Sequence, residues 1–186
     1  MKHVLVVGAT GALLGVSKYF IEQGHLVTLL ARSPMKLYGI KSEYPIASRR
    51  VSIIAQDYYE SDAALFKVED AVEKTRPIDI AIVRIDREGN LFAKKLFSYL
   101  LRQENKAQIY RILCSTKVKP ERLTASRLLK NYPQKYREIY LGYQQEDGNS
   151  RWLTQDEVVS GVIDAVENDN QTYTIGKTEP WENRPE

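Results

Sequence analysis

The amino-acid sequence predicts an α/β protein with a doubly wound parallel sheet and helices on both faces, in three layers (α/β/α). Three observations lead to this prediction. Short, nearly continuous apolar runs, typical of strands buried on both faces, recur along the chain. Amphipathic stretches with helical spacing separate most of these runs. A turn containing two glycines directly follows the first run, at the edge of the sheet where such folds bind ligands.

The elements follow from the spacing of apolar residues and from residues typical of helix ends. The predicted strands are residues 4–7, 26–30, 51–55, 78–83, 109–114, 138–143 and 173–175. The predicted helices are residues 12–23, 61–74, 91–101 and 155–167. Gly24 stands where a glycine commonly ends a helix, and Ser61 is predicted to be an N-cap. Thr154 and Glu157, three residues apart, match a capping box.

The composition is that of an ordinary globular protein. Hydrophobic residues make up 43% and charged residues 27% of the 186 positions, which excludes disordered and collagen-like classes. No apolar run approaches the roughly 20 residues that span a bilayer, so no membrane anchor is expected. The single cysteine, Cys114, excludes a disulfide framework and a cysteine-based zinc site. We expect one domain over residues 1–178, a polar tail over 179–186 and a cytoplasmic location.

The net charge of +3 is unevenly distributed. Residues 117–137 carry seven basic side chains and one acidic side chain, Glu121. A basic stretch with tyrosines can contact nucleic acid, but we favour solvated helix faces and attraction to an anionic cofactor, and expect no nucleic-acid partner. With only His3 and His25, neither a Ser-His-Asp triad nor a histidine metal site is expected, so no metal is predicted.

The turn after the first predicted strand has the features of a phosphate-binding turn. Gly8 allows the chain to turn sharply, and Gly11 leaves room for a pyrophosphate to come close. The amides that open the next helix, at Ala12 and Leu13, would face the phosphates, and Thr10 can add its hydroxyl. The alternative is a tight turn that binds no ligand. We favour a dinucleotide site.

Residues 4–11 (VLVVGATG) and 24–33 (GHLVTLLARS) resemble the start of a short-chain dehydrogenase/reductase or of its NmrA-like relatives. The resemblance extends to about residue 60 and is weak beyond it. It implies a Rossmann sheet and a nicotinamide cofactor. The third glycine of the family would fall at Leu14, whereas this chain has Gly15 one place later, which indicates a slightly altered helix start.

The end of the second predicted strand favours NADP over NAD. A carboxylate there would hydrogen-bond the ribose hydroxyls of NAD, but the chain has Arg32 and Ser33 instead, with Lys36 nearby. A guanidinium can bind a 2′-phosphate through two parallel hydrogen bonds. NAD remains the alternative. Asp57 matches the acidic residue of the family that meets the adenine amino group, or it simply caps the next turn.

The resemblance also implies catalytic residues. The serine at the end of the fifth strand corresponds to Ser115, which would orient a substrate carbonyl. The family's acid is a tyrosine, and a lysine four residues later lowers its pKa. That pair is missing, because Tyr132 precedes Lys135 by only three residues and Pro133 argues against a helix through them. The proton donor is therefore left open between Tyr132, Tyr136 and a water.

Residues 84–87 (Arg-Ile-Asp-Arg) replace the Asn-Asn-Ala-Gly segment that usually follows the fourth strand of the family. They form either a solvated turn or a contact with substrate or cofactor. Taken together, the sequence predicts an NADP(H)-binding, atypical short-chain dehydrogenase/reductase acting as an oxidoreductase on a small molecule. The alternative is a non-catalytic NADP(H)-binding sensor of the NmrA type. A homodimer is expected only because closed dimers are common.

Overall fold

The computed structural model describes residues 1–86, 88–102, 107–114, 127–146 and 148–185. The chain divides into two compact units, Met1–Ile109 and Tyr110–Glu186. One domain over residues 1–178 followed by a polar tail stays a prediction. Within the described residues, no helix is both long enough and apolar enough to cross a membrane.

In the first unit, the strands of the main sheet stand in the order β3-β2-β1-β4, and in the sequence β5 (Gln108–Cys114) contains the last residues of this unit and the first residues of the second. In the first unit, β1 (His3–Val7) pairs with β2 (Leu26–Ala31) and β4 (Ile80–Val83), and β2 pairs with β3 (Val51–Ala55). All three pairings are parallel. The strand order therefore reverses between β1 and β4, where doubly wound sheets bind ligands. The predicted fold class is confirmed.

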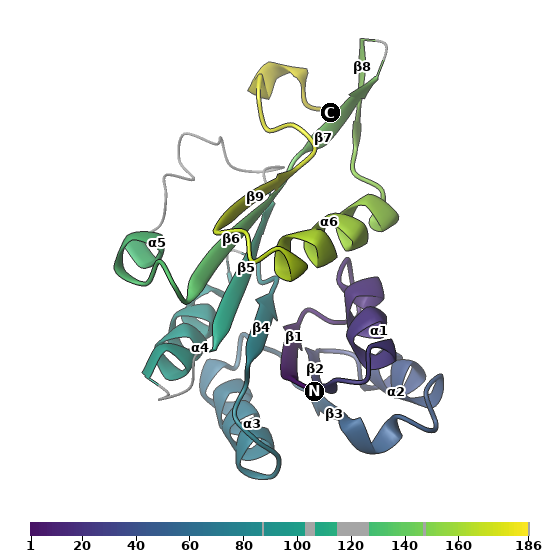
Figure 1. Ribbon diagram of the computed structural model, residues 1–186, viewed down its shortest axis with the longest axis vertical. Helices are drawn as coiled ribbons and strands as arrows, with labels where there is room; N and C mark the ends of the chain where they lie inside the picture. The colour runs from purple at the N-terminus through teal and green to yellow at the C-terminus, as the bar shows by residue number, and fades with distance from the viewer. Residues whose placement is uncertain (87, 103–106, 115–126, 147, 186) are drawn as a thin grey trace. The chain divides into compact units, whose positions relative to one another are not determined.

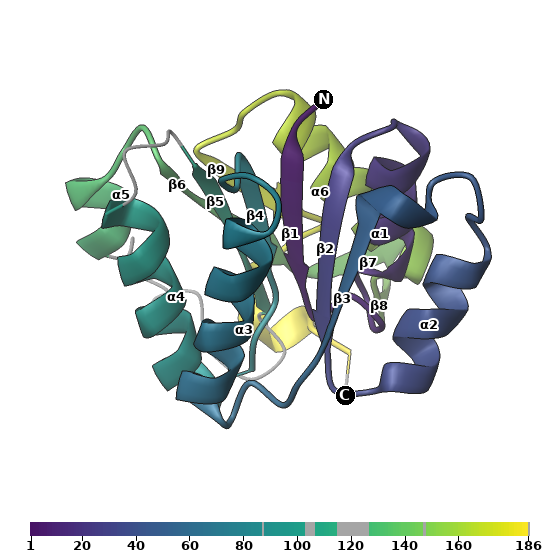
Figure 2. The same ribbon diagram turned by 90° about the horizontal axis from the view of Figure 1, so that it is seen from below.

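Helices cover both faces of these strands. Figure 2 shows α1 (Leu14–Glu22) and α2 (Pro34–Ser42) on one face, and α3 (Ser61–Glu73) and α4 (Asn90–Arg102) on the other. A short 3-10 helix, Ser48–Arg50, precedes β3. Because both faces are covered, every residue of β1 and of β4 is buried, as expected for parallel strands rich in Val, Ile and Leu.

One buried polar side chain, His3, stands at the start of β1. Its Nδ1 lies 2.6 Å from the carbonyl oxygen of Arg76, and its Nε2 lies 2.8 Å from the hydroxyl of Thr28. Since a carbonyl can only accept, Nδ1 carries the proton and Nε2 accepts from Thr28. Burial lowers the pKa of His3, so the neutral ring is the form the fold selects.

The second unit contains the last strands and helices. Strand β6 (Tyr136–Leu141) pairs in parallel with β9 (Thr172–Ile175), while β7 (Tyr143–Glu146) and β8 (Asn149–Trp152) form a separate antiparallel hairpin (Figure 1). The helical segments described in this unit are α5 (Arg127–Asn131), α6 (Gln155–Glu167) and a 3-10 helix at Trp181–Asn183.

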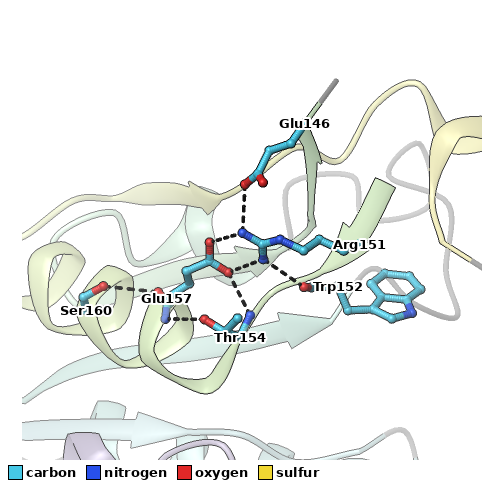
Figure 3. Close-up of polar contacts among 6 residues, drawn as sticks. All are labelled: Glu146, Arg151, Trp152, Thr154, Glu157 and Ser160. Carbon is cyan, nitrogen blue, oxygen red and sulfur yellow. Dashed lines mark hydrogen bonds and ion pairs between the residues drawn. The ribbon is translucent and has the colours of Figure 1, made fainter. Parts of the chain in front are cut away.

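Arg151 connects the hairpin to the start of α6 (Figure 3). Its guanidinium donates to Glu146 of β7 at 2.9 Å and to both carboxylate oxygens of Glu157 at 2.8 and 2.9 Å. Glu157 also accepts from the amide of Thr154, and the hydroxyl of Thr154 accepts from the amide of Glu157. The hydrogen bonds from Arg151 and from the Thr154 amide lower the pKa of Glu157 to about 2. The predicted capping box is confirmed.

In another ion pair of this unit, the cationic partner is buried and the anionic partner is partly exposed. Arg137 of β6 donates from Nε and Nη2 to the two carboxylate oxygens of Asp169, both at 3.0 Å. The Arg137 side chain is 7% exposed, and the hydroxyl of Tyr110 donates to the same carboxylate at 2.8 Å. Asp169 has a φ of +51°, in the left-handed region. Aspartate is one of the residues that adopt this left-handed backbone conformation in the turn after α6. The Asp169 carboxylate also neutralises the buried Arg137 guanidinium.

Several predicted boundaries need correction. Ser61 is not an N-cap: α3 follows Glu60 without a side-chain cap, and the Ser61 hydroxyl accepts from Lys95 instead. The strand predicted over 138–143 ends at Leu141, because the chain continues into β7. Helix α1 begins at Leu14 rather than at residue 12. Gly24 is confirmed just beyond the end of α1, with a φ of +79°. Helices α2 and α5 and the β7–β8 hairpin were not predicted.

Candidate functional site

The turn after β1 is held tightly against its neighbouring strands. The amides of Gly8 and Ala9 both donate to the carbonyl of Leu30 in β2, at 2.9 and 3.3 Å. Gly8 has a φ of +85°, and a Cβ there would lie 2.8 Å from the carbonyl oxygen of Arg84, which follows β4. Both the backbone conformation and the contact require glycine at this position.

The remainder of the turn leaves backbone donors unused. The Gly11 amide donates to Gly8, and the Leu14 amide donates to Gly11. Within the described residues, the amides of Thr10, Ala12 and Leu13 donate no hydrogen bond, and Leu13 provides no side-chain cap. The later start of α1 therefore leaves residues 12 and 13 in the turn, with N–H groups able to bind an anion beside a helix N-terminus.

Gly11 differs from Gly8 in what constrains it. A Cβ on Gly11 would meet only the Gly8 carbonyl oxygen at 3.8 Å and Nη1 of Arg84 at 4.0 Å, which are ordinary contacts. The described part of the chain thus gives no steric reason for a glycine here. A ligand that comes close to the backbone would give one.

Arg84 contributes a cation to the same place. Its amide donates to the carbonyl of Val7 at 3.1 Å, so its backbone is fixed beside the end of β1. Its side chain is half-buried, and Nη1 reaches the region of Gly11. Among the described residues, its guanidinium has neither a hydrogen bond nor an ion pair. Sequence reasoning left its role open, since nothing local indicates how close β4 ends to the glycine turn.

The residues predicted to select the dinucleotide follow β2. Arg32 is exposed directly after the strand, and Ser33 is the N-cap of α2, accepting from the amide of Lys36 at 3.4 Å. The Ser33 hydroxyl keeps its own proton for a further hydrogen bond. A guanidinium and the start of a helix thus follow β2, and the contact of Arg32 and Ser33 with a 2′-phosphate stays a prediction.

Asp86 ties the turns after β3 and β4 together. Its carboxylate accepts from the hydroxyls of Tyr59 and Tyr58, at 2.8 and 3.2 Å, and from the amide of Gly89 at 3.1 Å. Partial burial acts to raise the pKa of Asp86, but these hydrogen bonds and the charge of Arg32 outweigh it, and the pKa is lowered. Asp86 is thus ionised and occupied by protein donors. This part of the 84–87 segment is a structured connection between loops.

Asp57 caps a turn: its carboxylate accepts from the amide of Tyr59 at 3.0 Å. This is the second of the two roles considered for it, and a contact with adenine stays a prediction.

Of the catalytic candidates, Ser115 lies outside the described residues. Tyr132 directly follows α5 and is 40% exposed, and the backbone from Tyr132 to Lys135 forms a turn rather than a helix. Tyr136 is buried.

No protein-family model and no curated protein sequence matches the chain. Solved structures do. A β-ketoacyl-ACP reductase from Bacteroides thetaiotaomicron superposes with a TM-score of 0.71 at 16% identity, covering 98% of this chain and 99% of that chain. A short chain dehydrogenase from Bacillus anthracis str. Ames Ancestor gives 0.75 at 17% identity, covering 94% and 95%. An alcohol dehydrogenase from Comamonas testosteroni, specific for bulky-bulky ketones, gives 0.73 at 14% identity, covering 98% and 89%.

At these identities the likeness establishes the fold: the chain has the Rossmann-like α/β fold of short-chain dehydrogenases. The reversal of strand order and the glycine turn stand at the edge where folds of this class bind their ligands.

Proposed function

We propose that the protein binds a nicotinamide dinucleotide at the glycine turn, prefers NADP(H) to NAD(H), and is an oxidoreductase of the short-chain dehydrogenase/reductase type that acts on a small molecule. Two observations carry the proposal. The amides of Thr10, Ala12 and Leu13 are unused within the described residues, and no described residue requires a glycine at position 11. A pyrophosphate accounts for both.

The pyrophosphate and the adenine half of the cofactor have protein groups that fit them. The three amides and the Thr10 hydroxyl would hold the pyrophosphate, while Arg32 and Ser33 would hold the 2′-phosphate. Asp57 would lie at the adenine. When bound, the nicotinamide supplies or accepts a hydride, and the protein provides orientation. Ser115 would orient the substrate carbonyl, with Tyr132, Tyr136 or a water as proton donor.

A second function is favoured by one observation. Tyr132 and Lys135 lie in a turn after α5, so they do not stack on one helical face as a tyrosine–lysine acid pair would. A sensor that binds NADP(H) without turnover needs no such pair. The two functions share the cofactor site and differ only in whether carbonyl compounds cause NADPH to be consumed.

Calorimetric and thermal titration with NADPH and NADH tests the proposal. We expect both cofactors to raise the melting temperature and NADPH to bind more tightly, since a ligand at about 100 times its Kd adds about 2.7 kcal/mol of stability. Arg32→Ala should weaken NADPH selectively. Lys41→Ala, at the last turn of α2, is the matched control and should change neither affinity. The absence of any shift with either cofactor would refute dinucleotide binding.

A further inference from the structure

Arg84 stands at the point where the strand order reverses. Val83, the last residue of β4, is in register with Val7, the last residue of β1. The next amide, that of Arg84, donates to the Val7 carbonyl, and the Arg84 carbonyl lies against Gly8. The backbone of Arg84 is thus fixed on both sides against the glycine turn, so its side chain starts from a fixed position at the proposed site.

The guanidinium extends over this turn, with Nη1 4.0 Å from the position that a Cβ on Gly11 would take. Arg84 is half-buried as a residue, and no carboxylate in the described part of the chain pairs with its guanidinium. The nearby acid, Asp86, is already occupied by Tyr58, Tyr59 and Gly89. A cation that has no partner in the described part of the chain and lies beside unused amides is suited to an anion with several oxygens.

We infer that the Arg84 guanidinium binds the pyrophosphate of the dinucleotide, an inference that rests on the proposed function. The pyrophosphate is common to NADPH, NADH and ADP-ribose. Arg84 therefore contributes to affinity for all three, whereas Arg32 contributes only where a 2′-phosphate is present. Arg84 therefore raises the affinity for every ligand that has the pyrophosphate, and Arg32 provides selectivity for NADPH over NADH.

The experiment is calorimetric titration of wild type, Arg84→Met, Arg84→Lys and Arg32→Ala with NADPH, NADH, ADP-ribose and adenosine 2′-monophosphate. Arg84→Met should weaken the first three ligands by a common factor of about 10 or more, because a charge-assisted contact is lost, and should leave adenosine 2′-monophosphate unchanged. The affinities of Arg84→Lys for these three ligands should lie between those of Arg84→Met and those of the wild type. Arg32→Ala should show the opposite pattern, with NADPH and adenosine 2′-monophosphate weakened.

The backbone contacts of residue 84 do not depend on its side chain, so Arg84→Met should fold, which its thermal unfolding checks. Unchanged or tighter binding of ADP-ribose by Arg84→Met overturns the inference and leaves the proposed function intact. A wild-type protein that binds none of the dinucleotides overturns both. Selective loss of NADPH in Arg84→Met also overturns the inference, because it would assign the guanidinium to the 2′-phosphate.

Discussion

The carbonyl oxygen of Arg84 lies 2.8 Å from the position that a Cβ atom on Gly8 would occupy. This contact joins the end of β4 to the turn after β1. It also separates two glycines that look alike in the sequence. Gly8 is constrained by the protein itself, whereas a Cβ on Gly11 would make only ordinary van der Waals contacts within the described residues. Stability and ligand binding can therefore be tested at two positions three residues apart.

Gly8→Ala should destabilise the fold by about 3 kcal/mol. A positive φ costs an L-residue about 1–2 kcal/mol, and an overpacked contact adds about 1–3 kcal/mol. Urea unfolding measures the change. Gly24→Ala is the control for the backbone term, since Gly24 has a similar φ of +79° but nothing within 4 Å. Equal losses in the two variants would contradict the role of the Arg84 contact.

Gly11→Ala should leave the free energy of unfolding within about 0.5 kcal/mol of the wild type, because the added methyl makes only ordinary contacts. Its affinity for NADPH and NADH should nevertheless fall at least about tenfold, since the methyl enters the space proposed for the pyrophosphate. Unfolding and titration of the same preparation check both statements. Undiminished binding would remove the pyrophosphate from this turn.

His3 should make stability depend on pH near neutrality. Its folded-state pKa lies below the ordinary value of 6.5, so its contribution is complete above that value. The contribution is lost as the pH falls through 6.5 toward the folded-state pKa. The melting temperature, followed from pH 8 to pH 5, should drop in this interval. His3→Gln should be less stable at pH 8 and show a smaller drop, and an equal drop in both proteins would contradict the assignment.

Glu157→Gln should weaken the connection between the β7–β8 hairpin and α6, because it removes the charge that Arg151 and the Thr154 amide bind. The Glu157 pKa is lowered from 4.5 to about 2, so the contribution is present above 4.5 and is lost as the pH falls toward 2. Urea unfolding at pH 7 and pH 3.5 should show a difference from wild type that shrinks at the lower pH.

The neighbouring substitution Asp156→Asn serves as its control. Asp156 stands in the same first turn of α6, and its side chain has no partner among the described residues. At pH 7, Asp156→Asn should lower the free energy of unfolding by less than Glu157→Gln does. A larger effect from Asp156→Asn would point to the helix dipole alone rather than to the Arg151 pair.

Asp169→Asn should destabilise the second unit by about 2 kcal/mol or more, because it leaves the buried Arg137 guanidinium without its countercharge. Asparagine also adopts a φ of +51° readily, so the loss of stability in this variant reports the loss of the Asp169 charge and not backbone strain. Asp169→Ala should lose about 1 kcal/mol more through backbone strain. Urea unfolding ranks the variants, and an Asn variant as stable as the wild type would exclude an electrostatic role.

The central strands of the main sheet could be predicted because β1, β2 and β4 are buried almost throughout and are rich in apolar residues. Helix α2 could not be found from periodicity, since Leu37 and Ile40 are its only buried residues. The Ser33-Pro34 pair, an N-cap followed by proline, was the available signal. The β7–β8 hairpin was missed because its strands are largely polar, although Asp-Gly at 147–148 is a strong hairpin signal.

The glycine turn was predictable as a local pattern between a strand and a helix. The amides of Ala12 and Leu13 belong to that pattern, but the position of Arg84 was not predictable, because it depends on where β4 ends relative to β1. The same applies to Asp86, whose tyrosine partners come from the turn after β3. Contacts between distant loops are set by the sheet register, which no local pattern encodes.

The bonds from Tyr58 and Tyr59 to Asp86 have a consequence for the thermodynamics of binding. They join the turns after β3 and β4 before any ligand arrives, and both turns border the carboxyl edge of the sheet. A ligand that lies against them does not have to order them, so little conformational entropy is lost at that end. The adenine half of a dinucleotide would meet a preorganised surface, and the smaller entropic penalty should appear in its binding enthalpy and entropy.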